Sequence, residues 1–119
     1  MEPEYCWFIY GFKIMGYTIG YLDYQSMGNS CSVDFDWNKI MKNPKNFLGF
    51  FHTHPSGFHN PSETDHKTMK GWLVALGKPL LCGISCDNFD WLFLFEKNKP
   101  ERVIKFKQFL SLIIYKNPK

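Results

Sequence analysis

The segment FFHTHPSGFHNPSETD, residues 50–65, gathers side chains that can bind a metal ion. His52 and His54 are two residues apart at the end of an apolar run, and in an extended chain such side chains share one face. Asp65 follows a loop that contains proline, serine and glycine. Two imidazoles and one carboxylate form a three-ligand set with positions left for water or substrate, which is typical of a catalytic zinc. Non-haem iron uses the same ligand types, so the set predicts a metal site and leaves the metal open.

Two predicted elements bring these ligands together. Residues 47–51, FLGFF, predict a short strand that is apolar on both faces, and the two histidines extend it. Ser62 is a good helix N-cap, so Asp65 falls in the first turn of the helix that follows, which is expected to end at Gly77. The apolar stripe of this helix consists of Met69, Trp72, Leu73 and Leu76. The end of a strand and the start of a helix therefore meet at the predicted metal.

The rest of the sequence predicts strands and helices without a strict β-α-β repeat. An N-terminal hairpin is expected to turn at Gly11. Strands are expected at residues 6–10, 14–24, 32–35, 80–85, 91–95 and 103–106. Helical segments are expected at residues 36–44 and 106–116. This mixture predicts an α+β fold with a curved, mainly antiparallel sheet and one helix packed on it.

Composition predicts one globular domain over residues 1–119, with 45% hydrophobic residues for a core. No apolar run reaches the length of a membrane span, and no signal peptide is visible. Cys82 and Cys86 lie in a strand-like run and are expected to be buried free thiols, with a second metal site as the alternative. We therefore expect a reduced, cytoplasmic protein. At a net charge of +3, we expect neither a nucleic-acid partner nor a membrane partner.

Around the three ligands the sequence resembles the JAMM (MPN+, Mov34/JAB) metalloproteases. His-Thr-His-Pro at residues 52–55, the seven residues from Pro55 through Pro61, and then Ser62 and Asp65 match the signature of that family. The flanking stretches FLGFFHTHPSG and PSETDHKTMKGWLVALGKPLLCGI look like the neighbouring strands and helix of prokaryotic JAB domains. The resemblance implies a JAB/MPN-like fold and one zinc ion per chain. The stretch HTHPSGFHNPS also resembles RadC-like proteins, which have no settled activity.

The resemblance also implies catalytic roles for two further residues. The family uses a glutamate on an early strand, in a pattern like Glu-x-x-Gly-x-Leu-x-Gly. EYCWFIYG, from Glu4 to Gly11, matches the ends of this pattern, while Trp7 stands in place of the first glycine. We therefore assign the proton-transferring role to Glu4, with Glu2 as the second choice. Ser62 is expected to donate a hydrogen bond to the oxyanion while its oxygen caps the helix.

Family members of this type cleave peptide or isopeptide bonds after the C-terminal tail of ubiquitin or of ubiquitin-like and sulfur-carrier proteins. The resemblance thus implies a zinc-dependent hydrolase, and the short chain favours prokaryotic ubiquitin-like substrates over ubiquitin chains. A RadC-like protein of unsettled activity and an inactive MPN-type scaffold are the alternatives. His59 and His66 lie near the motif and are expected to be exposed and not to bind the metal, because three ligands already complete the set.

Overall fold

One sheet contains all the strands of the described structure. The computed structural model describes the backbone of residues 4–28 and 37–118, and the side chains of residues 5–25 and 39–118. Within these ranges the strand order is β6-β5-β4-β3-β1-β2-β8-β7. The strands are β1 (Glu4–Ile14), β2 (Tyr17–Gly28), β3 (Phe47–Thr53), β4 (Leu80–Cys86), β5 (Phe89–Phe95), β6 (Arg102–Val103), β7 (Lys107–Phe109) and β8 (Leu112–Lys116). Only β3 and β4 pair in parallel among the described strands, so the predicted α+β class with a mainly antiparallel sheet is confirmed.

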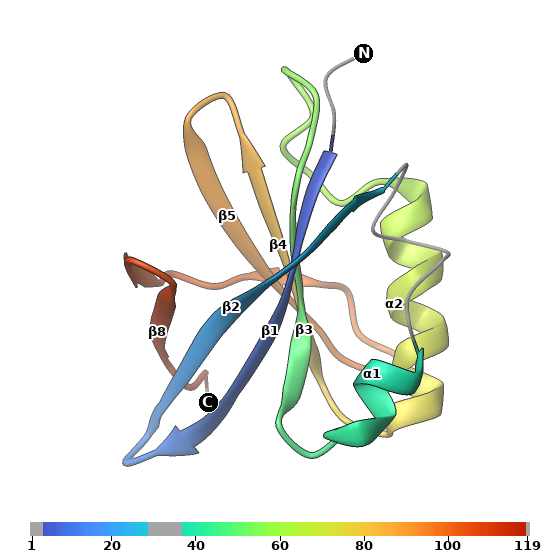
Figure 1. Cartoon of the computed structure of the whole chain (residues 1–119), viewed down its shortest axis with the longest axis vertical. Helices are drawn as coiled ribbons and strands as arrows, with labels where there is room; N and C mark the ends of the chain where they lie inside the picture. The colour runs from blue at the N-terminus through green and yellow to red at the C-terminus, as the bar shows by residue number, and fades with distance from the viewer. Residues whose placement is uncertain (1–3, 29–36, 119) are drawn as a thin grey trace.

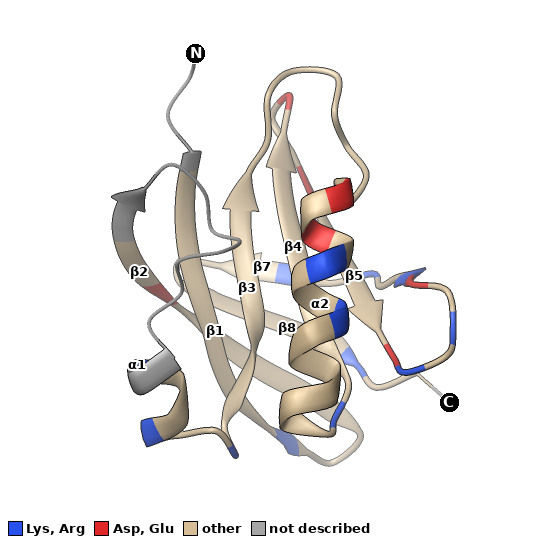
Figure 2. Cartoon of the chain, turned by 90° about the vertical axis from the view of Figure 1, so that its right-hand side faces the viewer, with Lys and Arg blue, Asp and Glu red and all other residues tan. Residues whose placement is uncertain are grey.

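Two helices lie within the described residues, α1 (Trp37–Lys42) and α2 (Glu63–Leu76), and both fall where helix was predicted. Figure 2 shows α2 lying along one face of the sheet, over β4 and beside β3. Met69 and Trp72 of α2 are buried there, and the Trp72 ring packs edge-on against Phe47 and Phe50 of β3, with centroids 5.4 and 5.5 Å away. Burial of each such side chain contributes about 1.5–3 kcal/mol, so the helix is held firmly on the histidine-bearing strand. No helix in the described part of the chain is long and apolar enough to cross a membrane.

The N-terminal hairpin turns at Met15 and Gly16, so the predicted turn at Gly11 is wrong. Both turn residues have positive φ, 50° and 82°, as a two-residue hairpin turn requires. Gly11 lies instead in the middle of β1, opposite Gly20 of β2. A Cβ atom at Gly11 would lie 1.9 Å from the carbonyl oxygen of Ile19. This glycine permits a close approach of two backbones, which sequence alone does not distinguish from a turn.

The predicted C-terminal helix at residues 106–116 is also wrong, because this segment forms β7 and β8 (Figure 1). Burial alternates along β8, where Ile113 and Tyr115 are buried and their neighbours are exposed. That period of two fits a strand, and β8 pairs with β2 along the sheet. The strand predicted at 103–106 is reduced to the two residues of β6, and the strand predicted at 32–35 lies outside the described residues.

The cysteines match the prediction in part. Cys82 and Cys86 are free thiols buried on β4, as expected. Cys6 on β1 is instead disulfide-bonded, so the expectation of a fully reduced chain is wrong for this residue. The pairing of distant cysteines is not readable from sequence spacing.

Candidate metal centre

The two predicted histidine ligands lie at the C-terminal end of β3. His52 is on the strand and is 2% exposed, on the face that α2 covers, and His54 follows directly after the last strand residue. The Nε2 atoms of the two rings are 2.8 Å apart, and the rings stand nearly perpendicular to each other. The spacing of two along an extended chain therefore brings both imidazoles to one point, as predicted.

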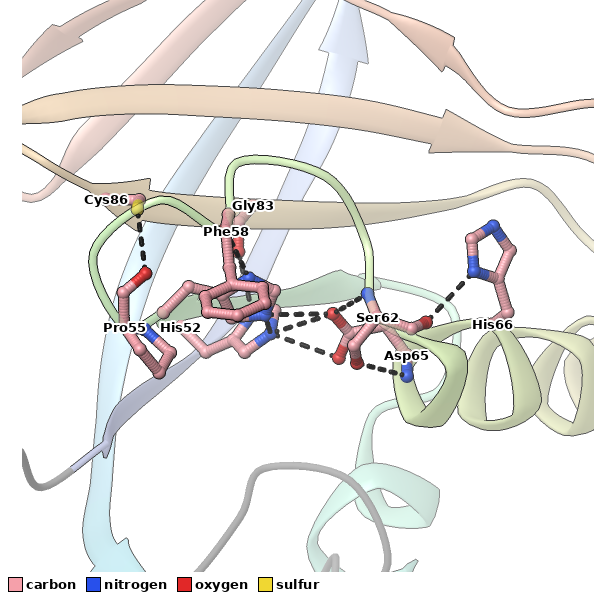
Figure 3. Close-up of polar contacts among 9 residues, drawn as sticks. His52, Pro55, Phe58, Ser62, Asp65, His66, Gly83 and Cys86 are labelled. Atoms are coloured by element: carbon pink, nitrogen blue, oxygen red, sulfur yellow. Dashed lines mark hydrogen bonds and ion pairs between the residues drawn. The ribbon is translucent and has the colours of Figure 1, made fainter. Parts of the chain in front are cut away.

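The third predicted ligand, Asp65, comes from the first turn of α2 and is 3% exposed. Ser62 caps this helix: its Oγ accepts from the Asp65 N–H at 3.0 Å, and its own N–H donates to Asp65 Oδ2 at 2.9 Å. This reciprocal capping box fixes the carboxylate. Its Oδ1 lies 3.0 Å from His52 Nε2 and its Oδ2 lies 3.0 Å from His54 Nε2 (Figure 3). We refer to His52, His54 and Asp65 as the metal triad.

The outer nitrogens of both rings determine what the inner nitrogens can do. His52 Nδ1 lies 2.8 Å from the carbonyl oxygen of Gly83, and His54 Nδ1 lies 2.8 Å from that of Phe58. A carbonyl oxygen only accepts, so in each ring Nδ1 carries the hydrogen. In the neutral rings both Nε2 atoms are then unprotonated, and two lone pairs converge with a carboxylate. Such a meeting of acceptors would favour a cation between them, and backbone carbonyls on the outer nitrogens are the usual support of histidine metal ligands.

The distances within the metal triad fit a metal ion. Ligand atoms bound to zinc at about 2.1 Å are about 3.4 Å apart in a tetrahedral site. In an octahedral site with bonds of similar length they are about 3.0 Å apart. The observed separations of 2.8 to 3.1 Å therefore suit an octahedral ion directly and a zinc ion after an expansion of a few tenths of an ångström.

The charge of Asp65 is also suited to a metal. Burial raises the pKa of this carboxyl, but hydrogen bonds from His52 and His54, when their Nε2 atoms carry a hydrogen, and from the Ser62 N–H lower it more, so without a metal the net pKa lies below its usual range. Asp65 is therefore a carboxylate at neutral pH, which is the form that binds a cation.

A fourth side chain near the metal triad was not predicted to lie there. The Sγ atom of Cys82 is within 4.8 Å of the ligand atoms of His52 and Asp65, and the residue is fully buried. Burial, and then the charges of Asp65 and Glu101, raise the pKa of this thiol well above its ordinary value. Without a metal the thiol is therefore neutral and packs behind the site, whereas a bound metal would stabilise its thiolate and could take it as a further ligand. The parallel pairing of β3 with β4 brings it there, opposite Phe50.

The proposed base is described only by its backbone. Glu4 is the first residue of β1, its side chain lies outside the described part of the structure, and Glu2 lies outside it entirely. Cys6 pairs with His52, and the Tyr5 N–H donates to Thr53 Oγ1 at 2.8 Å. The pairing of β1 with β3 begins at Cys6 and His52, so the backbone of Glu4 lies two residues before the strand pair that contains a histidine ligand.

The remaining predicted residues lie around the metal triad. Ser62 is exposed, and because its oxygen accepts from Asp65, its hydroxyl hydrogen is left to donate. His66 is exposed and bonds to the Ser62 carbonyl and to Glu101, at 2.9 Å each. His59 is half-buried, and its Nε2 lies 3.0 Å from Asp87. His66 is thus exposed, as predicted, whereas His59 is only partly so, and both rings contact carboxylates outside the metal triad.

The geometry defines a candidate three-ligand metal centre between the end of β3 and the start of α2. No model of a known protein family matches the chain. A search of curated proteins likewise finds no match.

Proposed function

We propose that the chain is a zinc-dependent hydrolase with a JAB/MPN-like fold. In this proposal it cleaves peptide or isopeptide bonds after the C-terminal tail of a ubiquitin-like protein. The observation that carries the proposal is the convergence of His52 Nε2, His54 Nε2 and the Asp65 carboxylate within 3.1 Å, with both outer ring nitrogens bonded to backbone carbonyls. The JAMM-like spacing of these residues connects the metal with hydrolysis.

The roles of the chain's own residues follow from their positions. A metal held by His52, His54 and Asp65 would lower the pKa of its bound water and so supply a hydroxide nucleophile for an amide carbonyl at neutral pH. Glu4 would accept a proton from the attacking water and pass it to the leaving amine, a role supported by its place on β1 two residues before Cys6, which pairs with His52. Ser62 donates its hydroxyl hydrogen to the oxyanion, while its oxygen continues to cap α2.

An extended tail suits an exposed strand edge, because main-chain pairing needs no deep pocket. β5 offers such an edge over residues 89–91: it pairs with β4 on one side, while among the described strands β6 reaches only Phe93 and Leu94. The ring of His59, in the loop beside the metal triad, lies 6.1 Å from the Trp91 ring on this edge. β4 separates this edge from the histidine-bearing strand β3, and the loop between His54 and Asp65 reaches the edge through His59, which supports a peptide tail as the substrate.

The test combines metal analysis with a cleavage assay. Native mass spectrometry of purified protein should find one zinc per chain, lost in Asp65→Asn and kept in the control His66→Gln. A fusion that carries a ubiquitin-like tail should be cleaved by the wild type and by the control only. Bound metal without cleavage of any ubiquitin-like fusion would favour the RadC-like alternative. A folded wild type with neither metal nor activity would favour the scaffold.

A further inference from the structure

A single carboxylate outside the metal triad holds the loop that follows β3. Asp87 accepts three hydrogen bonds from this loop. Ser56 Oγ donates to its Oδ1 at 2.6 Å, and the Gly57 N–H donates to its Oδ2 at 2.9 Å. His59 Nε2 lies 3.0 Å from the same Oδ2. Because the three donors lie within residues 56–59, Asp87 holds the whole tip of the loop. We refer to Asp87 and its three hydrogen bonds as the clamp.

Asp87 is itself anchored in the sheet. It and Asn88 form the two-residue turn between β4 and β5, with φ of 53° and 66°, and Cys86 pairs with Phe89 on either side. Asp and Asn are among the non-glycine residues that best tolerate this left-handed conformation. The Asp87 carboxylate therefore comes from the tight turn of a β-hairpin, which fixes its position relative to the sheet.

The clamped loop supports one of the metal ligands. Phe58 lies between two of the clamped residues, and its carbonyl oxygen lies 2.8 Å from His54 Nδ1. The backbone of His54 is held by the sheet, since its N–H donates to the Ser85 carbonyl at 3.0 Å, but its ring is oriented by this loop carbonyl. His52 differs, because its Nδ1 faces the carbonyl of Gly83, which is within β4.

The clamp is not a second metal site, although the ligand atoms of His59, Cys86 and Asp87 lie within 4.8 Å of one another. Around Asp87, donors meet an acceptor, and the thiol of Cys86 also donates to the Pro55 carbonyl, at 3.1 Å. Hydrogen bonds from Ser56, then Gly57 and His59, lower the pKa of Asp87 to about 2, so it is a carboxylate at neutral pH. In the metal triad, by contrast, acceptors meet acceptors and the hydrogens are on the outer nitrogens.

We propose that Asp87 is a positioning residue for the metal centre. It holds the loop so that the Phe58 carbonyl keeps the His54 imidazole turned with Nε2 toward the metal, although Asp87 touches no ligand. The inference rests on the proposed function, since it requires a metal at the triad. Loss of such an outer support typically weakens metal binding 10- to 100-fold, and we expect an effect of about that size.

The test compares Asp87→Gly with Asp90→Asn. Glycine keeps the left-handed turn and removes the clamp, whereas Asp90→Asn removes a neighbouring exposed carboxylate on β5. Two quantities are measured for each protein: the zinc Kd, by competition with a chromophoric chelator, and the hydrogen exchange of the Gly57 amide, by NMR. We expect Asp87→Gly to raise the Kd about 10- to 100-fold and to lose protection at Gly57. Asp90→Asn should leave both unchanged.

A second variant covers the case in which Asp87→Gly fails to fold. Ser56→Ala combined with His59→Ala removes two of the three donors and leaves the turn intact, and it should shift both quantities in the same direction. A zinc Kd that stays at the wild-type value while Gly57 loses protection would overturn the positioning role and leave the proposed function standing. A folded wild type that binds no zinc would overturn both.

Discussion

Metal binding at the triad should make the stability of this protein depend on zinc. Its three acceptor atoms are 2.8 to 3.1 Å apart in the folded chain and widely separated in the unfolded chain, so the ion binds the native state selectively. At a free zinc concentration of 100 times Kd, this linkage adds about 2.7 kcal/mol to the free energy of unfolding. For a domain of this size, that corresponds to a rise in Tm of roughly 10 °C.

His54→Ala separates this effect from ordinary packing. In the metal-free protein the substitution loses the bond to the Phe58 carbonyl, about 1 kcal/mol, but it also relieves the convergence of three acceptors. We therefore expect metal-free His54→Ala to lie within about 1 kcal/mol of the metal-free wild type. The zinc-dependent rise in Tm should vanish in His54→Ala and in Asp65→Asn, because each loses a ligand.

The assay is thermal unfolding by circular dichroism, with each protein measured after treatment with a chelator and again in excess zinc. His66→Gln is the matched control. It also removes a histidine, at the position after Asp65 in the first turn of α2, and it should keep the full zinc-dependent rise in Tm. The reasoning is refuted if the wild-type Tm does not respond to zinc while His54→Ala costs more than about 2 kcal/mol under both conditions. That outcome would make the triad a structural hydrogen-bond cluster.

Three further predictions concern catalysis and the sheet. Ser62→Ala should lower kcat roughly 100-fold with zinc retained, and should cost about 1 kcal/mol through the lost cap; an unchanged kcat with a lower Tm would leave capping as its only role. Glu4→Gln should keep zinc, measured by native mass spectrometry, and lose nearly all cleavage; normal cleavage here with loss in Glu2→Gln would move the base by two residues. Gly11→Ala should lower Tm because its Cβ would lie 1.9 Å from the Ile19 carbonyl oxygen. Gly71→Ala, in open space on α2, should instead raise the free energy of unfolding by about 1 kcal/mol. Equal effects of the two changes would contradict the close approach of β1 and β2.

Local rules were sufficient for the parts of the site that are close in sequence. The period of two along residues 52–54 placed both imidazoles on one face, and the serine N-cap placed Asp65 in the first helical turn, as the structure confirms. The same local rules fail at Gly11, where they predict a turn, and at residues 106–116, where they predict a helix. In both cases the structure depends on a contact with another strand: Gly11 faces the backbone of Ile19, and β8 pairs with β2. A local sequence pattern does not contain such contacts.

The sequence by itself determined which residues form the metal triad, because a strand, a short loop and a capped helix are all specified within residues 47–77. Only the tertiary structure decided what surrounds them. Parallel pairing of β3 with β4 brings Gly83 to the outer nitrogen of His52 and Cys82 behind the site, and the turn after β4 brings Asp87 to the loop. These partners are some 30 residues away from the groups they support, and their positions follow from sheet register, which depends on the packing of the whole core and not on any local periodicity.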